Sequence, residues 1–218
     1  FVCLVFVVFL VVFVGVVAFS LDVCLAACDT AARGLGHLGA FGPDTFAYLD
    51  PLTFEALAER LGLNATDFAA GVKTAVQTNP VPSQPFPGIP EMIAELARSH
   101  SLAVVSASHS DVLSAFLKAN GLRPCFQHVL GGENPAEKAT KIKSLLGEIP
   151  RDSDFFVGDA VSDVAAAHDA GIACCVVSWG WQPLDRLLAQ GPEHVAYEPS
   201  DILAIANARI SSASGARA

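Results

Sequence analysis

Two carboxylates follow an apolar run in the C-terminal half of the chain. Asp159 comes directly after Gly158, which ends the run, and Asp163 lies four residues later in an Ala-rich segment that closes on Gly171. This order predicts a strand, a loop and a helix, and it places both carboxylates at the carboxyl end of the strand. Oxygen ligands suit Mg²⁺, which proteins hold through one or two carboxylates together with phosphate and water. The alternative is that Asp159 caps the helix and Asp163 favours its dipole.

Strands and helices alternate on both sides of this segment. We expect strands at residues 102–106, 128–130, 155–157, 174–177 and 194–196, and helices at 90–99, 110–120, 136–146, before Gly171, at 183–189 and from 200 onward. Near-continuous apolar strands that alternate with helices indicate a parallel sheet covered on both faces. The predicted fold class is therefore α/β, with a Rossmann-like core.

A smaller helical unit precedes this core. A helix over residues 54–61 is predicted to begin after Thr53, which can cap it, and to stop at Gly62. A second helix is predicted over residues 67–77, with Thr66 as its cap. The apolar positions of the first helix fall on one face, which is typical of a helix packed on one side.

A proline-rich linker separates the two units. Prolines 80, 82, 85, 87 and 90 leave no room for a helix or a central strand. We therefore expect three parts: an apolar N-terminal segment with the first core strand (1–28), a helical cap insertion (29–83) and the α/β core (84–218).

The charge balance argues against one class of partner. The chain has 22 acidic residues against 13 basic ones, a net charge of −9, and no basic stripe, which disfavours nucleic-acid binding. The six cysteines lack the spacing of zinc ligands, and Cys174 and Cys175 lie in an apolar run that favours buried thiols. A reducing compartment, and hence a cytoplasmic location, is expected.

The first nineteen residues are almost entirely Val, Phe and Leu, with one glycine at Gly15. Their length makes them a membrane-span candidate, but no basic residue precedes Arg33 to flank an anchor or signal peptide. If residues 14–19 form a central strand, about thirteen residues remain, too few for the roughly 20 of a spanning helix. Strand and span therefore exclude each other, and a membrane is not an expected partner. A fragment or a misread start of the coding sequence would also explain the run.

A small helical unit, a proline-rich linker and an alternating α/β core follow one another in this chain. In this order they resemble the haloacid dehalogenase-like (HAD) hydrolase superfamily, and within it the phosphoglycolate phosphatase-like branch with a small helical cap. Residues 85–90 match the hinge between cap and core, and Ser106 and Lys138 match two later motifs. Asp159 and Asp163 match the metal motif and would hold Mg²⁺. The resemblance implies a Mg²⁺-dependent phosphatase of a small phosphorylated metabolite. Dehalogenases of the superfamily lack the Gly-Asp-x-x-x-Asp arrangement, so its presence favours the phosphatases.

The resemblance also implies how the phosphate would be bound. Ser106, with the backbone N–H groups of the neighbouring Ala107 and Ser108, would donate hydrogen bonds to the transferring phosphoryl group. Lys138, with Lys141 as the alternative, would offset the charge of nucleophile and phosphate together.

The family's first motif is an apolar strand followed by Asp-x-Asp-Gly-Thr, in which the first Asp attacks phosphorus and the second acts as acid and base. Aligned on residues 20–24, the motif puts Ser20 at the nucleophile position and Asp22 at the acid–base position, where its backbone carbonyl would also contact the metal. An alcohol is a poor nucleophile without a neighbouring base, and Asp44 and Asp50 are the alternative nucleophiles. Two hypotheses follow: a Mg²⁺-dependent phosphatase, or a catalytically impaired relative that binds a phosphorylated ligand or a partner.

Overall fold

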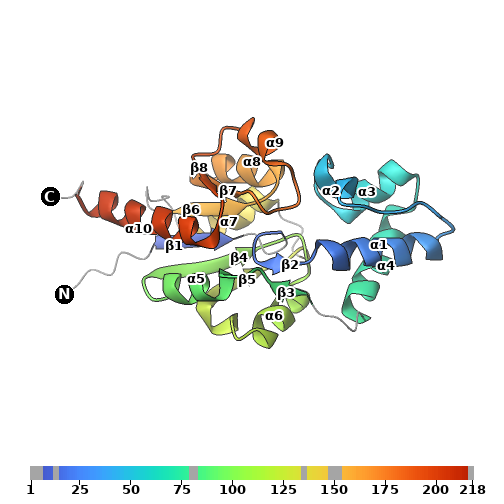
Figure 1. The fold of residues 1–218 in the computed structure, drawn as a ribbon, viewed down its shortest axis with the longest axis horizontal. Coiled ribbons are helices and arrows are strands. Elements are labelled where there is room, and N and C mark those ends of the chain that lie inside the picture. Colours follow the sequence, from blue (N-terminus) through green and yellow to red (C-terminus); the bar gives the residue numbers. More distant parts are fainter. Residues whose placement is uncertain (1–6, 12–14, 79–82, 134–136, 147–153, 216–218) are drawn as a thin grey trace.

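The computed structural model describes residues 7–11, 15–78, 83–133, 137–146 and 154–215. A six-stranded sheet forms the centre of the described chain, with the strand order β5-β4-β1-β6-β7-β8 and parallel pairing throughout (Figure 1). Its strands are β1 (Val7–Val11), β4 (His100–Val105), β5 (Phe126–Leu130), β6 (Phe155–Gly158), β7 (Ala173–Val177) and β8 (His194–Ala196). The predicted parallel α/β architecture is confirmed.

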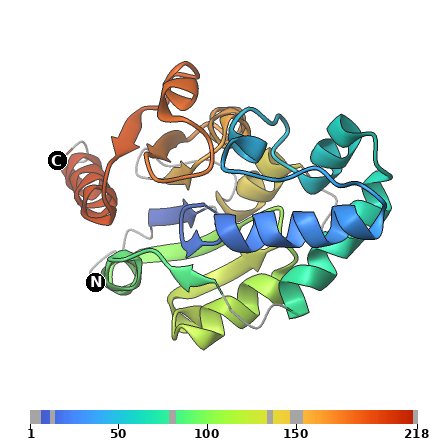
Figure 2. The ribbon, with the colours of Figure 1, turned by 45° about the vertical axis from the view of Figure 1, so that its right-hand side comes forward.

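Helices cover both faces of this sheet. The core helices are α5 (Ile89–Leu96), α6 (Ser110–Ala119), α7 (Lys138–Leu146), α8 (Val161–Asp169), α9 (Leu184–Leu188) and α10 (Pro199–Gly215), with a 3₁₀ turn, η1 (Arg123–Cys125). In both ribbon views α7, α8 and α9 lie on one face and α5 and α6 on the other, where α10 packs against α5 (Figures 1 and 2). Coverage on both sides explains why strands such as β6 and β7 are apolar along nearly their whole length.

The core is a single apolar cluster around the central strands. Leu102, Phe155, Phe156 and Val176 are fully buried in it. Burying one such large side chain contributes about 1.5–3 kcal/mol. The two cysteines of β7, Cys174 and Cys175, are also fully buried among these side chains, whereas Cys3 lies outside the described residues.

A second cluster holds the helical cap, which lies at one end of the sheet, on the right in Figure 1. Its helices are α1 (Leu21–Gly34), α2 (Asp44–Ala47), α3 (Phe54–Leu61) and α4 (Ala65–Thr78). Two short antiparallel strands, β2 (Ala18–Phe19) and β3 (Gln84–Pro85), connect it to the core. Residues 21–28, expected beside the first core strand, instead form the start of α1 and pack on α4, because their buried side chains are those of a helix face.

Helix capping in the cap matches the sequence at one helix and differs at the next. The Thr53 hydroxyl accepts a hydrogen bond from the Ala56 N–H at the start of α3, and Gly62 ends that helix with a φ of +70°. At the start of α4 the cap is Asn64, whose side-chain oxygen accepts from the Asp67 N–H (3.0 Å), and Thr66 lies inside the helix. Asn and Thr both serve as caps, so residue type alone did not decide between them.

The first core strand lies earlier than the sequence suggested. β1 spans Val7–Val11, whereas the described part of the expected strand, residues 15–19, contributes only the two-residue β2. A uniform apolar run offers several equivalent registers, and pairing with β4 and β6 selects one of them. Residues 1–6 and 12–14 of the run lie outside the described residues, as do Pro80, Pro82 and Ala136. Within the part of the chain that is described, no helix combines the length and hydrophobicity needed to cross a membrane.

Candidate active site

The carboxyl ends of β4 and β6 flank the end of β1. Val11, the last residue of β1, pairs with Val104 on one side and with Val157 on the other. Ser106 and Asp159 each lie two residues beyond these partners. Because neighbouring strands are about 4.8 Å apart, the two residues stand roughly 10 Å apart on either side of the β1 axis. This edge of the sheet is where parallel α/β folds bind ligands.

Asp163 lies in the first turn of α8 and is completely buried. Its Oδ2 accepts hydrogen bonds from the N–H groups of Asp159 and Ala160, both at 2.9 Å, and its Oδ1 accepts from the Lys138 ammonium. Asp163, rather than Asp159, therefore satisfies the N-terminus of α8. Of the two candidate lysines, Lys138 is the one that reaches the carboxylates.

Asp159 is 1% exposed, and its Oδ2 accepts a hydrogen bond from the Trp181 N–H (2.9 Å). Burial, and after it the charge of Asp163, raise the pKa of this carboxyl to about 7, against the opposing effects of the Trp181 N–H and Lys138. A buried carboxylate pair with one ammonium is short of positive charge. Such a site favours the binding of a cation.

The backbone lies close to these two carboxylates at three glycines. A Cβ atom added to Gly158 would overlap Asp163, and one added to Gly15 or Gly180 would overlap Asp159. Gly15 also has a φ of +83°, a conformation that side chains other than glycine rarely adopt. The chain that follows β1 therefore passes directly against the Asp159 carboxylate.

The loop after β4 is held by its neighbours. The Ser106 N–H donates to Leu130 O (3.0 Å), and Ser106 Oγ accepts from the Ser108 N–H (3.1 Å). Ala107 lies against Gly132, because a Cβ atom added to Gly132 would overlap the carbonyl oxygen of Ala107. Lys141 is buried and donates from Nζ to Gly131 O (2.9 Å), so it fastens the neighbouring loop after β5.

The other predicted catalytic residues lie in the cap. Ser20 immediately precedes α1, and its Oγ donates to Ala18 O (3.2 Å). Asp22 is exposed in the first turn of α1, and Asp44 is exposed at the start of α2. Asp50 lies 3.9 Å from the Arg186 guanidinium. None of these four follows a strand of the six-stranded sheet, whereas Ser106 and Asp159 do.

Two features of the site went unrecognised in the sequence. The first is the close approach of Gly15 to Asp159, and the signal that could have located it is that Gly15 is the one glycine of the apolar run. The second feature is the contact of Trp181 with Asp159, which uses a backbone N–H and so leaves no trace in residue type.

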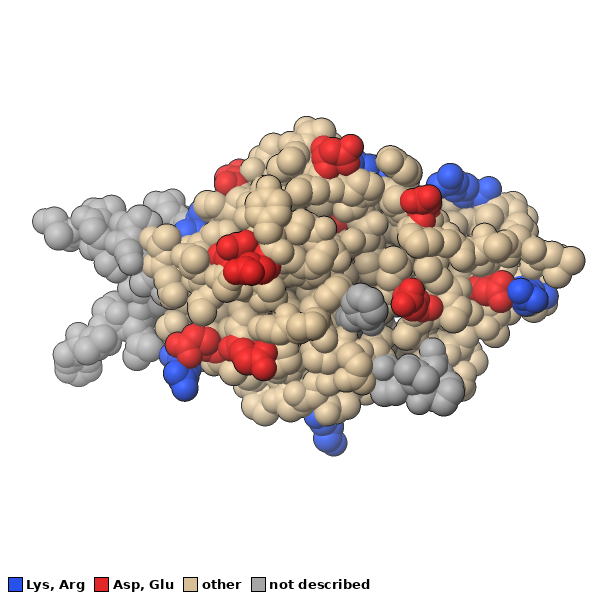
Figure 3. Space-filling model, viewed as in Figure 1, with Lys and Arg blue, Asp and Glu red and all other residues tan. Residues whose placement is uncertain are grey.

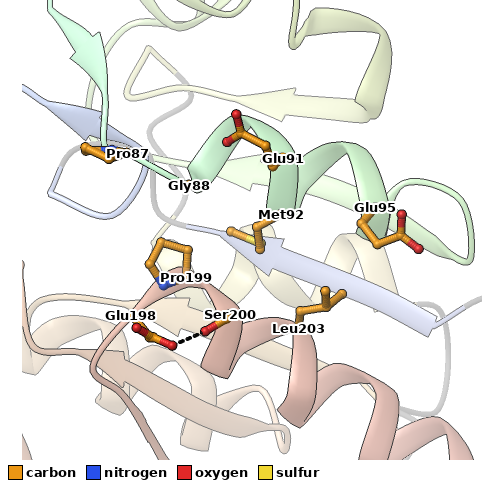
Figure 4. A pocket seen from close by; sticks show the side chains of 9 residues that line it. All are labelled: Pro87, Gly88, Glu91, Met92, Glu95, Glu198, Pro199, Ser200 and Leu203. Carbon is orange, nitrogen blue, oxygen red and sulfur yellow. Dashed lines mark hydrogen bonds between the residues drawn. The ribbon is translucent and has the colours of Figure 1, made fainter.

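A cavity of ≈ 580 Å³ lies elsewhere, between α5 and α10 (Figure 4). Met92, Pro199 and Leu203 line it, and Glu91 and Glu95 stand on the α5 side. None of the site residues described above belongs to its lining. Acidic side chains are spread over the molecular face that Figure 3 shows, in keeping with the net charge of −9.

Comparison with known proteins identifies similar sequences. A family model described as haloacid dehalogenase-like hydrolase matches residues 40–177. The phosphoglycolate phosphatase of Synechococcus elongatus is 33% identical over 124 residues, 55% of this chain and 58% of that protein. That of Vibrio vulnificus is 26% identical over 216 residues, 87% of this chain and 95% of the relative. For the Synechococcus protein and for relatives from Caulobacter vibrioides and Dickeya dadantii, the chain spans about half of the relative's length, 48% to 58%.

Solved structures share the fold. A haloacid dehalogenase-like family hydrolase from Streptococcus pneumoniae superposes with a TM-score of 0.74 at 19% identity, covering 91% of this chain and 97% of that one. A protein from Clostridium acetobutylicum, described as a predicted phosphatase, has a TM-score of 0.81 at 14% identity and covers 91% and 96%. At these identities the likeness concerns the fold alone.

Proposed function

Because the chain belongs to the haloacid dehalogenase-like hydrolase family, we propose that its site binds a small phosphorylated metabolite, as in phosphoglycolate phosphatase-like enzymes, whose reaction is Mg²⁺-dependent hydrolysis of a phosphate monoester. The observation that carries this proposal is the pair of Ser106 and Asp159 at the two strand ends that flank β1. A phosphate between them would meet the Ser106 hydroxyl on one side and Lys138 on the other.

Phosphate recognition and phosphate hydrolysis depend on different residues of this site. Recognition needs hydroxyl and ammonium groups, which Ser106 and Lys138 supply. Hydrolysis in this family also needs a carboxylate directly after the central strand. The position of Gly15 against Asp159 supports aligning the Asp-x-Asp-Gly-Thr motif on residues 12–16, eight positions before Ser20.

In this register valines replace both carboxylates, Val12 for the nucleophile and Val14 for the acid–base. A valine side chain can neither attack phosphorus nor carry a proton. This specific observation favours the second function, a relative that binds the phosphorylated ligand and hydrolyses it far more slowly than its relatives. Ser20 then has no part in the chemistry.

The donor set at the site fits Mg²⁺, although with few ligands. Asp159 and Asp163 supply two carboxylates, and no group of three or more His, Cys, Asp or Glu side chains that could hold a metal exists among residues 7–11, 15–78, 83–133, 137–146 and 154–215. Asp163 already accepts three hydrogen bonds, so Asp159 would be the main protein ligand. Mg²⁺ there would neutralise phosphate charge, and phosphate oxygens and water would complete its coordination.

The proposal is tested by separating binding from turnover. Calorimetric titration with 2-phosphoglycolate and with inorganic phosphate, each with and without Mg²⁺, measures binding, and release of phosphate from an aryl phosphate measures hydrolysis. Asp159→Asn removes the main cation ligand, and Asp169→Asn makes the same change on the exposed end of α8. We expect Mg²⁺-dependent binding that only Asp159→Asn abolishes, with hydrolysis close to the uncatalysed rate.

Two results would contradict this proposal in different ways. Mg²⁺-dependent hydrolysis that is lost in Asp159→Asn would establish an active phosphatase with another nucleophile. Absence of binding by the folded wild-type protein would refute the phosphate site itself.

A further inference from the structure

The loop between β7 and α9 contacts four parts of the molecule within four residues. Trp179 Nε1 donates to Val16 O (3.2 Å), in the segment that follows β1. The Trp181 N–H donates to Asp159 Oδ2 (2.9 Å). Gln182 contacts both the core helix α8 and the cap. This loop, residues 179–182, therefore joins the site to the cap.

Gln182 is the residue that spans the two domains. Its Nε2 donates to Leu49 O in the cap (2.7 Å), and its Oε1 accepts from the N–H of Val161, the first residue of α8 (2.8 Å). The side chain is 3% exposed, so neither bond exchanges freely with water. The two partners fix the orientation of the amide, because only its nitrogen can donate and only its oxygen can accept.

The cap segment 46–49 is docked on this loop and on α9 by further contacts. The Trp181 ring lies 4.7 Å from the Phe46 ring, centroid to centroid, and belongs to the apolar cluster of the cap. Arg186 donates from its guanidinium to Ala47 O (3.1 Å). Trp179, two residues earlier, packs instead against the cluster of the sheet. The loop thus has one aromatic ring in each domain.

We propose that Gln182 is a positioning residue that couples the docking of cap segment 46–49 to the geometry of Asp159 and Asp163. Val161 begins the helix turn that carries Asp163, and Trp181, beside Gln182, holds Asp159. Displacing the cap segment removes Leu49 O, the acceptor of the Gln182 Nε2 hydrogen bond, and so removes one of the two contacts that fix the amide against α8. Phosphate binding and cap docking then favour each other, and thermodynamic linkage makes the effect equal in both directions.

This inference rests on the proposed function, because phosphate binding is one of its readouts. Gln182→Glu keeps the acceptor for the Val161 N–H and removes the donor to Leu49 O, so it breaks only the cap side. Gln182→Met removes both bonds. Gln190→Glu introduces the same charge at an exposed position after α9 and is the matched control.

The experiment combines hydrogen exchange with calorimetry. Exchange of the amides in residues 44–50 is measured by mass spectrometry with and without saturating inorganic phosphate, and calorimetry gives the affinity for inorganic phosphate. In the wild type we expect phosphate to slow this exchange. In Gln182→Glu we expect faster exchange without phosphate, no added protection with it, and affinity lower by about two- to tenfold, the worth of one hydrogen bond. Gln190→Glu is expected to match the wild type.

The possible failures are distinguishable. If wild-type protein binds no phosphate, the proposed function fails. If it binds phosphate but Gln182→Glu has the wild-type affinity and the same phosphate-dependent protection of residues 44–50, only the coupling is refuted. If ligand-free Gln182→Glu exchanges residues 44–50 at the wild-type rate, Gln182 does not hold the cap segment, and the coupling is refuted whatever phosphate does.

Discussion

A Cβ atom placed on Gly15 would overlap the carboxylate of Asp159, so the backbone after β1 and the end of β6 meet at this point. The contact joins two residues that are 144 positions apart in the sequence. It brings Gly15 to the site, whereas the sequence analysis aligned the first motif of the family, with its nucleophile position, on Ser20. The same contact makes Gly15 the position in the apolar run at which the smallest change is expected to matter most.

We predict that Gly15→Ala destabilises the protein more than Gly62→Ala. Both glycines have positive φ, and an alanine in that conformation costs about 1–2 kcal/mol. Gly62 faces open space, whereas a methyl group on Gly15 must also displace Asp159, which adds about 1–3 kcal/mol. Urea unfolding of both variants measures the difference in the free energy of unfolding. If the two variants lose the same free energy of unfolding, Gly15 is not in contact with Asp159.

We predict that Val12→Asp combined with Val14→Asp introduces Mg²⁺-dependent hydrolysis of an aryl phosphate. These two changes restore the carboxylates that the family places directly after the central strand, next to Gly15. Ser20→Asp combined with Val23→Gly and Cys24→Thr installs the same motif at the start of α1 and serves as the control. Phosphate release should increase only in the first variant. Activity in the second variant alone would support the alignment of the motif that begins at Ser20.

The sequence predicted the core downstream of residue 85 well and the start of the chain poorly, for one physical reason. Helices and strands after residue 85 differ in periodicity and are separated by Gly or Pro, so each has a recognisable boundary. The first nineteen residues are uniformly apolar, and only Gly15 marks a register within them. The pairing of β1 with β4 and β6, which decides the register, is a tertiary property.

The residues of the candidate site also divide into those that the sequence could indicate and those that it could not. Asp159 and Asp163 could be proposed because carboxylates have few structural uses after a buried strand, and Lys138, at the start of α7, could be proposed from its register in the family resemblance. Gln182 could not, because it binds backbone atoms, and one of them belongs to Leu49, 133 positions away. Contacts of this kind depend on the fold and impose no residue type on the partner.

We predict that Lys138→Met weakens the binding of inorganic phosphate by about tenfold or more. The change removes the ammonium that pairs with Asp163 and would face the phosphate, and leaves two buried carboxylates opposite an anion. Lys143→Met, at an exposed position of the same helix, is the control and should bind as the wild type does. The measurement is calorimetric titration at constant ionic strength. Equal affinities of the two variants would exclude Lys138 from the phosphate site.

We predict that Glu133 contributes to stability above about pH 5 and ceases to do so as the pH falls towards 2. Hydrogen bonding with the Ser110 side chain, and in smaller part the hydrogen bond that Glu133 Oε2 accepts from the Ser110 N–H (3.0 Å), lowers the pKa of the carboxyl to about 2 in the folded protein. The unfolded chain therefore binds its proton first on acidification, and protonation favours unfolding in that range. The side chain is exposed, so solvent screening limits the effect to about 1 kcal/mol or less. Urea unfolding at pH 7 and pH 3.5 should show a stability loss in the wild type that is smaller in Glu133→Gln. Glu137→Gln, a change at an exposed neighbouring position, is the control and should lose as much unfolding free energy between the two pH values as the wild type. If Glu133→Gln also loses as much as the wild type, the hydrogen bond to Ser110 has no role in acid stability.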